Sequence, residues 1–146
     1  MYEHSPLLQA VMHNTEAYAD KTAIIMNGQE VSYSALGKNI RKAAYVFQHI
    51  GLRAGDRVIL SAHKDVEYVY LYFAAHILGV TNVIVDAESN EERLHFIENK
   101  IRPACCFGYK SSGFPSKLFD ELDLNNAEEL YESTANIAST IIIQFD

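Results

Sequence analysis

The order of apolar segments between residues 57 and 109 constrains the fold of this chain most strongly. Three strand-like segments alternate with two segments of helical character. The strands are RVILSA (57–62), TNVIVDA (81–87) and ACCFGY (104–109), and the helices cover 65–79 and 89–100. Helix-length connections join parallel strands, and continuous apolar strands are typical of a sheet covered on both faces. The sequence therefore predicts an α/β layered fold, with a mostly parallel sheet flanked by helices.

A β-hairpin and further helices are expected ahead of this unit. The strands 21–26 and 30–33 enclose Asn27 and Gly28, and this dipeptide is the strongest short signal for a tight hairpin turn. One helix is expected before the hairpin, and another begins after it at Ser34, with apolar residues at helical spacing. In the later helix 89–100, Leu94, Phe96 and Ile97 are expected to face inward.

The chain changes character after residue 109. We expect an α/β core over 1–109 and a polar, acidic, variable excursion over 110–139, with a short helix over 126–132. The stretch STIIIQFD (139–146) is again rich in β-favouring apolar residues. Residues 140–146 are therefore predicted to form a core strand.

Composition excludes several classes of protein. Hydrophobic residues make up 49% and charged residues 21%, which is typical of a globular domain rather than a disordered chain. The net charge of −7 disfavours binding of nucleic acid through a broad basic patch. No apolar run reaches the ~20 residues that span a bilayer, and the N-terminus lacks a signal-peptide pattern, so we expect a cytoplasmic protein. The adjacent Cys105 and Cys106 are expected to be reduced and buried on opposite faces of a strand.

Motifs that carry chemistry are missing from the sequence. It contains no GxxxxGK[ST] phosphate loop, no GxGxxG, no HExxH and no GxSxG. His63 and Lys64 follow a strand, where α/β proteins bind ligands, but a structural histidine and a solvated lysine are the simpler interpretations. His76 is interpreted as a core histidine. Three tyrosines of the helix 65–79 are expected to pack against other residues: Tyr68, Tyr70 and Tyr72. We therefore predict no catalytic, cofactor-binding or metal-ligating residue in this chain.

Four stretches, taken together, resemble the N-terminal part of the adenylate-forming (AMP-binding) enzymes. This superfamily includes acyl-CoA synthetases, adenylation domains of peptide synthetases, and luciferases. The stretches are ADKTAII (19–25), VSYSAL (31–36), GLRAGDRVIL (51–60) and LGVTNVIVDAESNEERLHFI (78–97). The resemblance implies structural roles for six matched residues: Tyr33, Gly55, Asp56, Gly79, Asp86 and Arg93. Ile84, Ala87 and Asn90 replace prolines that are usual in the family, which argues against a typical peptide-synthetase domain and leaves the subclass open.

The resemblance implies that the chain is the N-terminal subdomain of an ATP-dependent ligase that activates a carboxylic acid. The implied ligase uses ATP and Mg²⁺, and passes the acyl group to coenzyme A or to the phosphopantetheine of a carrier protein. The strand 140–146 then leads to the phosphate-binding loop, which lies beyond the 146 residues. The chain alone is expected to bind no cofactor and to be inactive. Its partners are the rest of the parent chain and the acid substrate, and we expect it to self-associate through exposed core surface.

Two other interpretations stay open. The chain could be a stand-alone binding or scaffold module derived from such an enzyme, which docks on a partner through residues 141–145. It could also be an unrelated flavodoxin-like domain that binds a ligand at the carboxyl ends of its strands. The sequence does not determine which acid is activated, which thiol accepts it, or whether Asp146 is a natural end.

Overall fold

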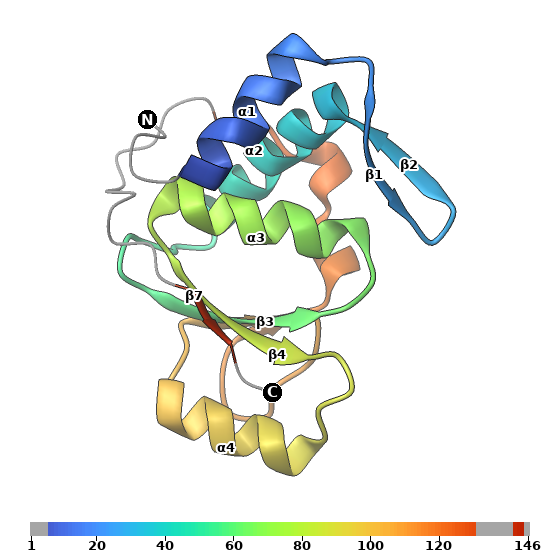
Figure 1. Ribbon diagram of the computed structural model, residues 1–146. Coiled ribbons are helices and arrows are strands. Elements are labelled where there is room, and N and C mark those ends of the chain that lie inside the picture. The colour runs from blue at the N-terminus through green and yellow to red at the C-terminus, as the bar shows by residue number, and fades with distance from the viewer. Residues whose placement is uncertain (1–5, 131–141, 145–146) are drawn as a thin grey trace.

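The computed structural model describes residues 6–130 and 142–144 of the chain (Figure 1). The helices are α1 (Pro6–Ala17), α2 (Tyr33–His49), α3 (Val66–Leu78) and α4 (Glu91–Ile101), with two short 3-10 helices, η1 (Phe119–Leu122) and η2 (Leu124–Asn126). The strands are β1 (Thr22–Met26), β2 (Gln29–Ser32), β3 (Arg57–Ala62), β4 (Thr81–Asp86), β5 (Cys105–Phe107), β6 (Ser116–Lys117) and β7 (Ile142–Gln144).

Five strands form one sheet in the order β6-β5-β3-β4-β7, and each neighbouring pair is parallel. Leu60 in the central strand β3 stands opposite Ile84 of β4 on one side and Phe107 of β5 on the other. The predicted α/β fold with a parallel sheet is confirmed. The structure also places β7 at an edge of this sheet, beside β4.

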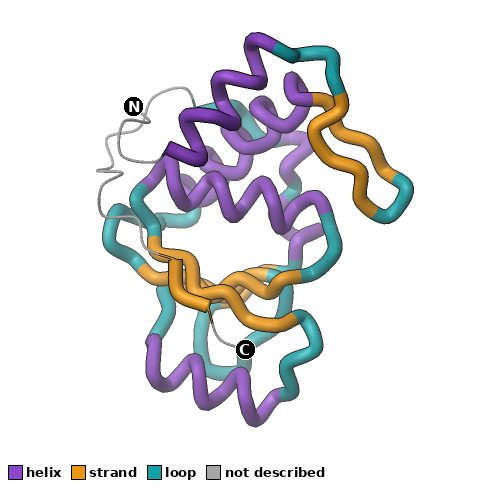
Figure 2. The backbone as a smooth tube through the Cα atoms, viewed as in Figure 1, coloured by secondary structure: helices purple, strands orange, loops and turns teal. Residues whose placement is uncertain are grey.

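Helices cover both faces of the sheet (Figures 1 and 2). α1, α2 and α3 lie on one face, and α4 lies on the other. Side chains of β3 alternate accordingly: Val58 and Leu60 join the larger core under α2 and α3, whereas Ile59 joins the smaller core under α4. Cys105 and Cys106 divide in the same way between the two cores, as predicted.

The sequences of α2 and α3 explain where α2 begins and why α3 is so deeply buried. α2 begins at Tyr33, one residue earlier than expected, because the Ser32 side chain accepts a hydrogen bond from the Ala35 backbone N–H (3.1 Å) and caps the helix. Nine of the thirteen residues of α3 are buried, since it packs both on α2 and on the sheet.

The expectation for Phe96 in α4 is wrong. Ile97 is fully buried, but the Phe96 side chain is 55% exposed, and the Lys100 ammonium lies 5.5 Å from its ring centre. Positions 94, 97 and 101 share the face toward the sheet at helical spacing, and residue 96 points about 100° away from residue 97 around the helix axis.

The segment after β5 also differs from the prediction. Residue 126 is the last residue of η2, residues 127–130 form no helix, and residues 131–132 of the expected helix 126–132 lie outside the described residues. The chain instead forms η1 and η2, whose Leu122 is buried and whose Phe119 and Leu124 pack against the larger core. This part of the expected excursion therefore covers apolar residues of the core rather than standing free of it.

The predicted hairpin is present, as an antiparallel pair in which Met26 stands opposite Gln29. Asn27 (φ 52°) and Gly28 (φ 78°) both take the left-handed conformation that a tight turn of this kind requires. The Asn27 side-chain amide donates a hydrogen bond to the Lys64 backbone carbonyl, so the hairpin tip is attached to the turn between β3 and α3. Within the described residues, no helix is long and apolar enough to cross a membrane.

Candidate functional site

The carboxyl ends of the parallel strands meet at one edge of the sheet. β3 ends at Ala62, β4 at Asp86, β5 at Phe107 and β7 at Gln144. In α/β folds, ligands bind outside this edge, because the loops and helix N-termini that follow the strands gather there. We refer to this edge of the sheet, at which β3, β4, β5 and β7 end, as the carboxyl edge and take it as the candidate site.

His63 connects two strand ends at the carboxyl edge. Its Nε2 lies 2.9 Å from the Gly108 carbonyl oxygen, and its ring packs edge-on against Phe119 at 5.7 Å between ring centres. Because a carbonyl oxygen only accepts, Nε2 carries the hydrogen of this bond. The arrangement favours the structural interpretation of His63. The neighbouring Lys64 is exposed, as the solvated interpretation predicts.

Gly108 follows β5 in a position that suits only glycine. Its φ is 94°, and a Cβ built on it would lie 3.0 Å from Ser61 Cβ and 3.1 Å from the His63 ring. Gly108→Ala is therefore expected to lower the free energy of unfolding by roughly 2–4 kcal/mol, through backbone strain and overpacking. Urea unfolding measures the loss. The control is Gly113→Ala, where nothing lies within 4 Å of the added carbon, and equal midpoints for the two variants would contradict the packing described.

Asp86 and Arg93 belong to one connection at the carboxyl edge. The Asp86 carboxylate accepts a hydrogen bond from the Glu88 backbone N–H (2.9 Å), which shapes the turn after β4. The Arg93 backbone N–H then donates to the Asn90 side chain (2.8 Å), which caps α4. Asp86 itself is exposed.

Gly55, Asp56 and Gly79 come together at the opposite, amino-terminal edge of the sheet. The Gly55 N–H donates to the Gly79 carbonyl (2.9 Å), and the Thr81 N–H donates to the Asp56 carbonyl (2.8 Å). The Asp56 carboxylate accepts from the Arg53 N–H (2.8 Å) and closes the turn before β3. This set joins the starts of β3 and β4, far along both strands from the carboxyl edge.

Tyr33 lies apart from both groups. It is the first residue of α2, its backbone N–H donates to the Lys21 carbonyl (2.9 Å), and its half-buried ring packs against the larger core. Of the six matched residues, the structure thus gathers three at the amino-terminal edge and two in the β4–α4 connection. The sixth joins the hairpin to α2.

A cluster of Glu91, His95 and Ser112 has the composition of a catalytic triad but not its geometry. The Ser112 hydroxyl lies 3.2 Å from His95 Nε2, and a Glu91 carboxylate oxygen lies 3.8 Å from the same nitrogen. A triad requires the nucleophile on one ring nitrogen and the acid on the other. This cluster therefore does not activate Ser112.

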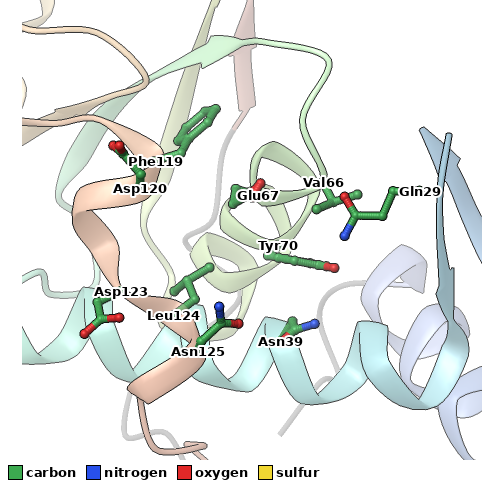
Figure 3. A pocket seen from close by; sticks show the side chains of 10 residues that line it. All are labelled: Gln29, Asn39, Val66, Glu67, Tyr70, Phe119, Asp120, Asp123, Leu124 and Asn125. Carbon is green, nitrogen blue, oxygen red and sulfur yellow. The ribbon is translucent and has the colours of Figure 1, made fainter. Parts of the chain in front are cut away.

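A cavity of about 370 Å³ lies between the hairpin, α2, α3 and the 3-10 helices (Figure 3). Its walls carry three carboxylates, Glu67, Asp120 and Asp123, and no basic side chain among the lining residues. Burial raises the pKa of the Tyr70 phenol in its wall. A cavity with this charge disfavours a nucleotide triphosphate. No local pattern in the sequence predicts this cavity, because its walls come from four separate segments.

The sequence analysis also missed a buried carboxylate. Glu98 in α4 is 2% exposed and accepts hydrogen bonds from the hydroxyls of Tyr109 (2.8 Å) and Ser111 (2.9 Å). In the part of the chain that the structure describes, no three His, Cys, Asp or Glu side chains are placed to hold a metal ion.

Comparison with known proteins gives a consistent result. The family described as "AMP-binding enzyme" matches residues 11–146. An L-proline–[L-prolyl-carrier protein] ligase of Pseudomonas fluorescens is 36% identical over 91 residues, which are 62% of this chain and 18% of that protein. A crotonobetaine/carnitine–CoA ligase of Salmonella typhi is 31% identical over 88 residues, 56% of this chain and 17% of that protein. The chain thus spans less than a fifth of the length of either relative.

Solved structures resemble the fold. The N-terminal subdomain of NpsA from Klebsiella oxytoca, in complex with 3-hydroxybenzoyl-AMSN, matches with a TM-score of 0.77 and 15% identity over 90% of this chain and 34% of that one. The O-succinylbenzoate coenzyme A synthetase MenE from Bacillus subtilis, in complex with AMP, matches with a TM-score of 0.69 and 23% identity, over 84% of this chain and 34% of that one. At these identities the likeness concerns the fold alone.

Proposed function

Because the chain belongs to the AMP-binding enzyme family, we propose that it forms the N-terminal part of an ATP-dependent ligase that activates a carboxylic acid. The family match over residues 11–146 is the observation that carries this proposal. The position of β7 supports it. β7 runs parallel to β4 and ends at the carboxyl edge, where a following loop would meet a ligand.

The proposed reaction has two steps. A carboxylate oxygen of the acid attacks the α-phosphorus of ATP, the bond to the β-phosphate bridging oxygen breaks, and acyl-adenylate and pyrophosphate form. The thiol of coenzyme A or of a carrier protein then attacks the acyl carbon and releases AMP. Mg²⁺ would neutralise phosphate charge. In our proposal, its ligands lie in the rest of the parent chain.

This chain contributes scaffold rather than catalytic groups in our proposal. Residues 1–109 form the subdomain core, 110–139 a variable excursion, and 140–146 the strand that leads to the phosphate-binding loop. Gly55, Asp56 and Gly79 fix the starts of β3 and β4. Asp86 and Arg93 shape the connection after β4, so that the carboxyl edge is presented to the nucleotide. The thiol acceptor, the self-association and the cytoplasmic location stay predictions.

ATP–pyrophosphate exchange tests the proposal. The purified 146-residue chain is expected to show no acid-dependent exchange, because it carries no phosphate-binding loop motif. A product of the same gene that extends past Asp146 through a Ser/Thr/Gly-rich loop is expected to exchange with one class of carboxylic acid. Robust exchange by the 146-residue chain would show that the catalytic machinery lies within it. If a stop codon follows Asp146 in the gene, the ligase assignment fails for this protein.

A further inference from the structure

Glu98 is a buried acid that two hydroxyl groups hold in place. It lies in the third turn of α4, its residue is 2% exposed, and none of the ion pairs among the described residues includes it. Burying a carboxylate is costly unless hydrogen bonds replace its water. Here each oxygen accepts one hydroxyl: Oε2 accepts from Tyr109 (2.8 Å) and Oε1 accepts from Ser111 (2.9 Å).

Both donors belong to the connection between β5 and β6, residues 108–115. Ser111 also organises the turn of this connection, because its hydroxyl oxygen accepts from the backbone N–H groups of Gly113 (3.2 Å) and Phe114 (3.1 Å). Its own N–H donates to the Ser116 hydroxyl (3.0 Å). Ser111, whose hydroxyl oxygen organises the turn, thus directs its own hydrogen to Glu98.

The surroundings of Tyr109 keep its phenol protonated, so that it acts as a hydrogen-bond donor. Burial raises the pKa of the Tyr109 phenol, and it raises the pKa of the Cys106 thiol to about 12. Both groups therefore keep their hydrogens at neutral pH. The phenol hydrogen is directed to Glu98, so this bond links the connection after β5 to α4.

The connection leaves β5 at the carboxyl edge but does not cover it. Tyr109 and Phe114 pack into the smaller core on the α4 face, and the Arg102 guanidinium lies 5.8 Å from the Phe114 ring centre. Figure 1 shows this segment passing beneath the sheet, beside α4. Local sequence does not require this course, since the segment is polar and glycine-containing.

We propose that Glu98 is a positioning residue, which turns the β5–β6 connection onto the α4 face through Tyr109 and Ser111 and so keeps the carboxyl edge clear. Charge-assisted hydrogen bonds are about twice as strong as neutral ones, and two of them converge on a single carboxylate. The benefit of a clear edge to catalysis rests on the proposed function. The position of the connection itself does not depend on it.

Hydrogen exchange of single amides in the purified chain tests this inference. Glu98→Leu leaves the two hydroxyls without their acceptor and is expected to speed exchange at Gly113 and Phe114 about tenfold or more, relative to the change at Ile59 and Val83. A residue that only stabilises the core would speed all four amides alike. The matched control is Glu92→Gln, which neutralises an exposed carboxylate on the same helix and is expected to leave the exchange pattern unchanged.

Two milder variants keep the test decisive if Glu98→Leu does not fold. Glu98→Gln keeps the side-chain shape and one acceptor oxygen, so it is expected to restore part of the protection at Gly113 and Phe114. Tyr109→Phe removes one donor and leaves the Ser111 bond, and the increase in exchange is expected to be smaller than in Glu98→Leu. Unchanged exchange at Gly113 and Phe114 in all folded variants, or a uniform increase along the chain, would overturn the inference. Neither measurement uses ATP, so failure here is distinct from failure of the proposed ligase.

Discussion

Phe107→Ala is expected to lower the free energy of unfolding by roughly 3–5 kcal/mol, the usual cost of removing a buried aromatic ring. Phe107 lies in β5, is fully buried, and stacks against Phe47 of α2 with 4.8 Å between ring centres and 26° between ring planes. Removing the ring takes away this contact between β5 and α2. Because β5 is paired on both sides, the backbone has little freedom to fill the cavity that remains. Urea unfolding followed by circular dichroism measures the loss.

A double-mutant cycle separates the stacking from simple burial. Phe47→Ala is expected to cost a similar amount, and the double variant is expected to cost less than the two single losses together, by about 0.5–1.5 kcal/mol. Phe96→Ala is the matched control, since that ring is 55% exposed and its removal is expected to change stability by no more than about 0.5 kcal/mol. If Phe107→Ala costs no more than Phe96→Ala, the larger core is not arranged as described here.

The layered fold was predictable because the signals that define it are local and repeated. Each of β3, β4 and β5 is a short apolar run, and each connection between them has the length and periodicity of a helix. The hairpin followed from Asn27 and Gly28, whose positive φ angles the structure shows. The four ordered blocks indicated the adenylate-forming family, and the match of the AMP-binding family to residues 11–146 confirms that resemblance.

The segment after β5 was not predictable, because no periodic pattern controls it. The 3-10 helices η1 and η2 have four and three residues, too few to show a helical repeat, and Leu122 is buried by contacts with residues distant in sequence. Phe96 was assigned inward because it is apolar and adjacent to Ile97. The structure shows instead that three residues of α4, spaced three and four apart, pack in the smaller core between the helix and the sheet: Leu94, Ile97 and Ile101.

The candidate site was predictable in its place but not in its chemistry. His63 follows a strand, so its position at the carboxyl edge could be inferred, whereas its bond to Gly108 joins residues 45 apart in sequence. Glu98 appears in the sequence as one more acid on an amphipathic helix. In the folded chain Tyr109 and Ser111 bond to it, and these residues are 11 and 13 positions away in sequence.

The chain is expected to lose stability at alkaline pH, and the buried Cys106 thiol contributes to this loss. Burial in the smaller core raises the pKa of its thiol from 9.0 to about 12. Between these values the unfolded chain releases the thiol proton and the folded chain retains it. The folded state then binds more protons than the unfolded state, so stability falls as pH rises. The stabilisation is complete below pH 9, and its loss by pH 12 amounts to about 4 kcal/mol from this group.

Cys106→Ser isolates this contribution, because serine keeps a small hydrogen-bonding side chain beside Tyr109 but does not titrate in the same range. Its baseline stability is expected to be lower, so the informative quantity is the slope of unfolding free energy against pH, measured by urea unfolding from pH 8 to pH 11. The wild-type slope is expected to be steeper by up to about 1.4 kcal/mol per pH unit above pH 9. Parallel slopes would mean that the Cys106 thiol reaches solvent, and therefore that the connection held by Tyr109 and Glu98 does not close the smaller core.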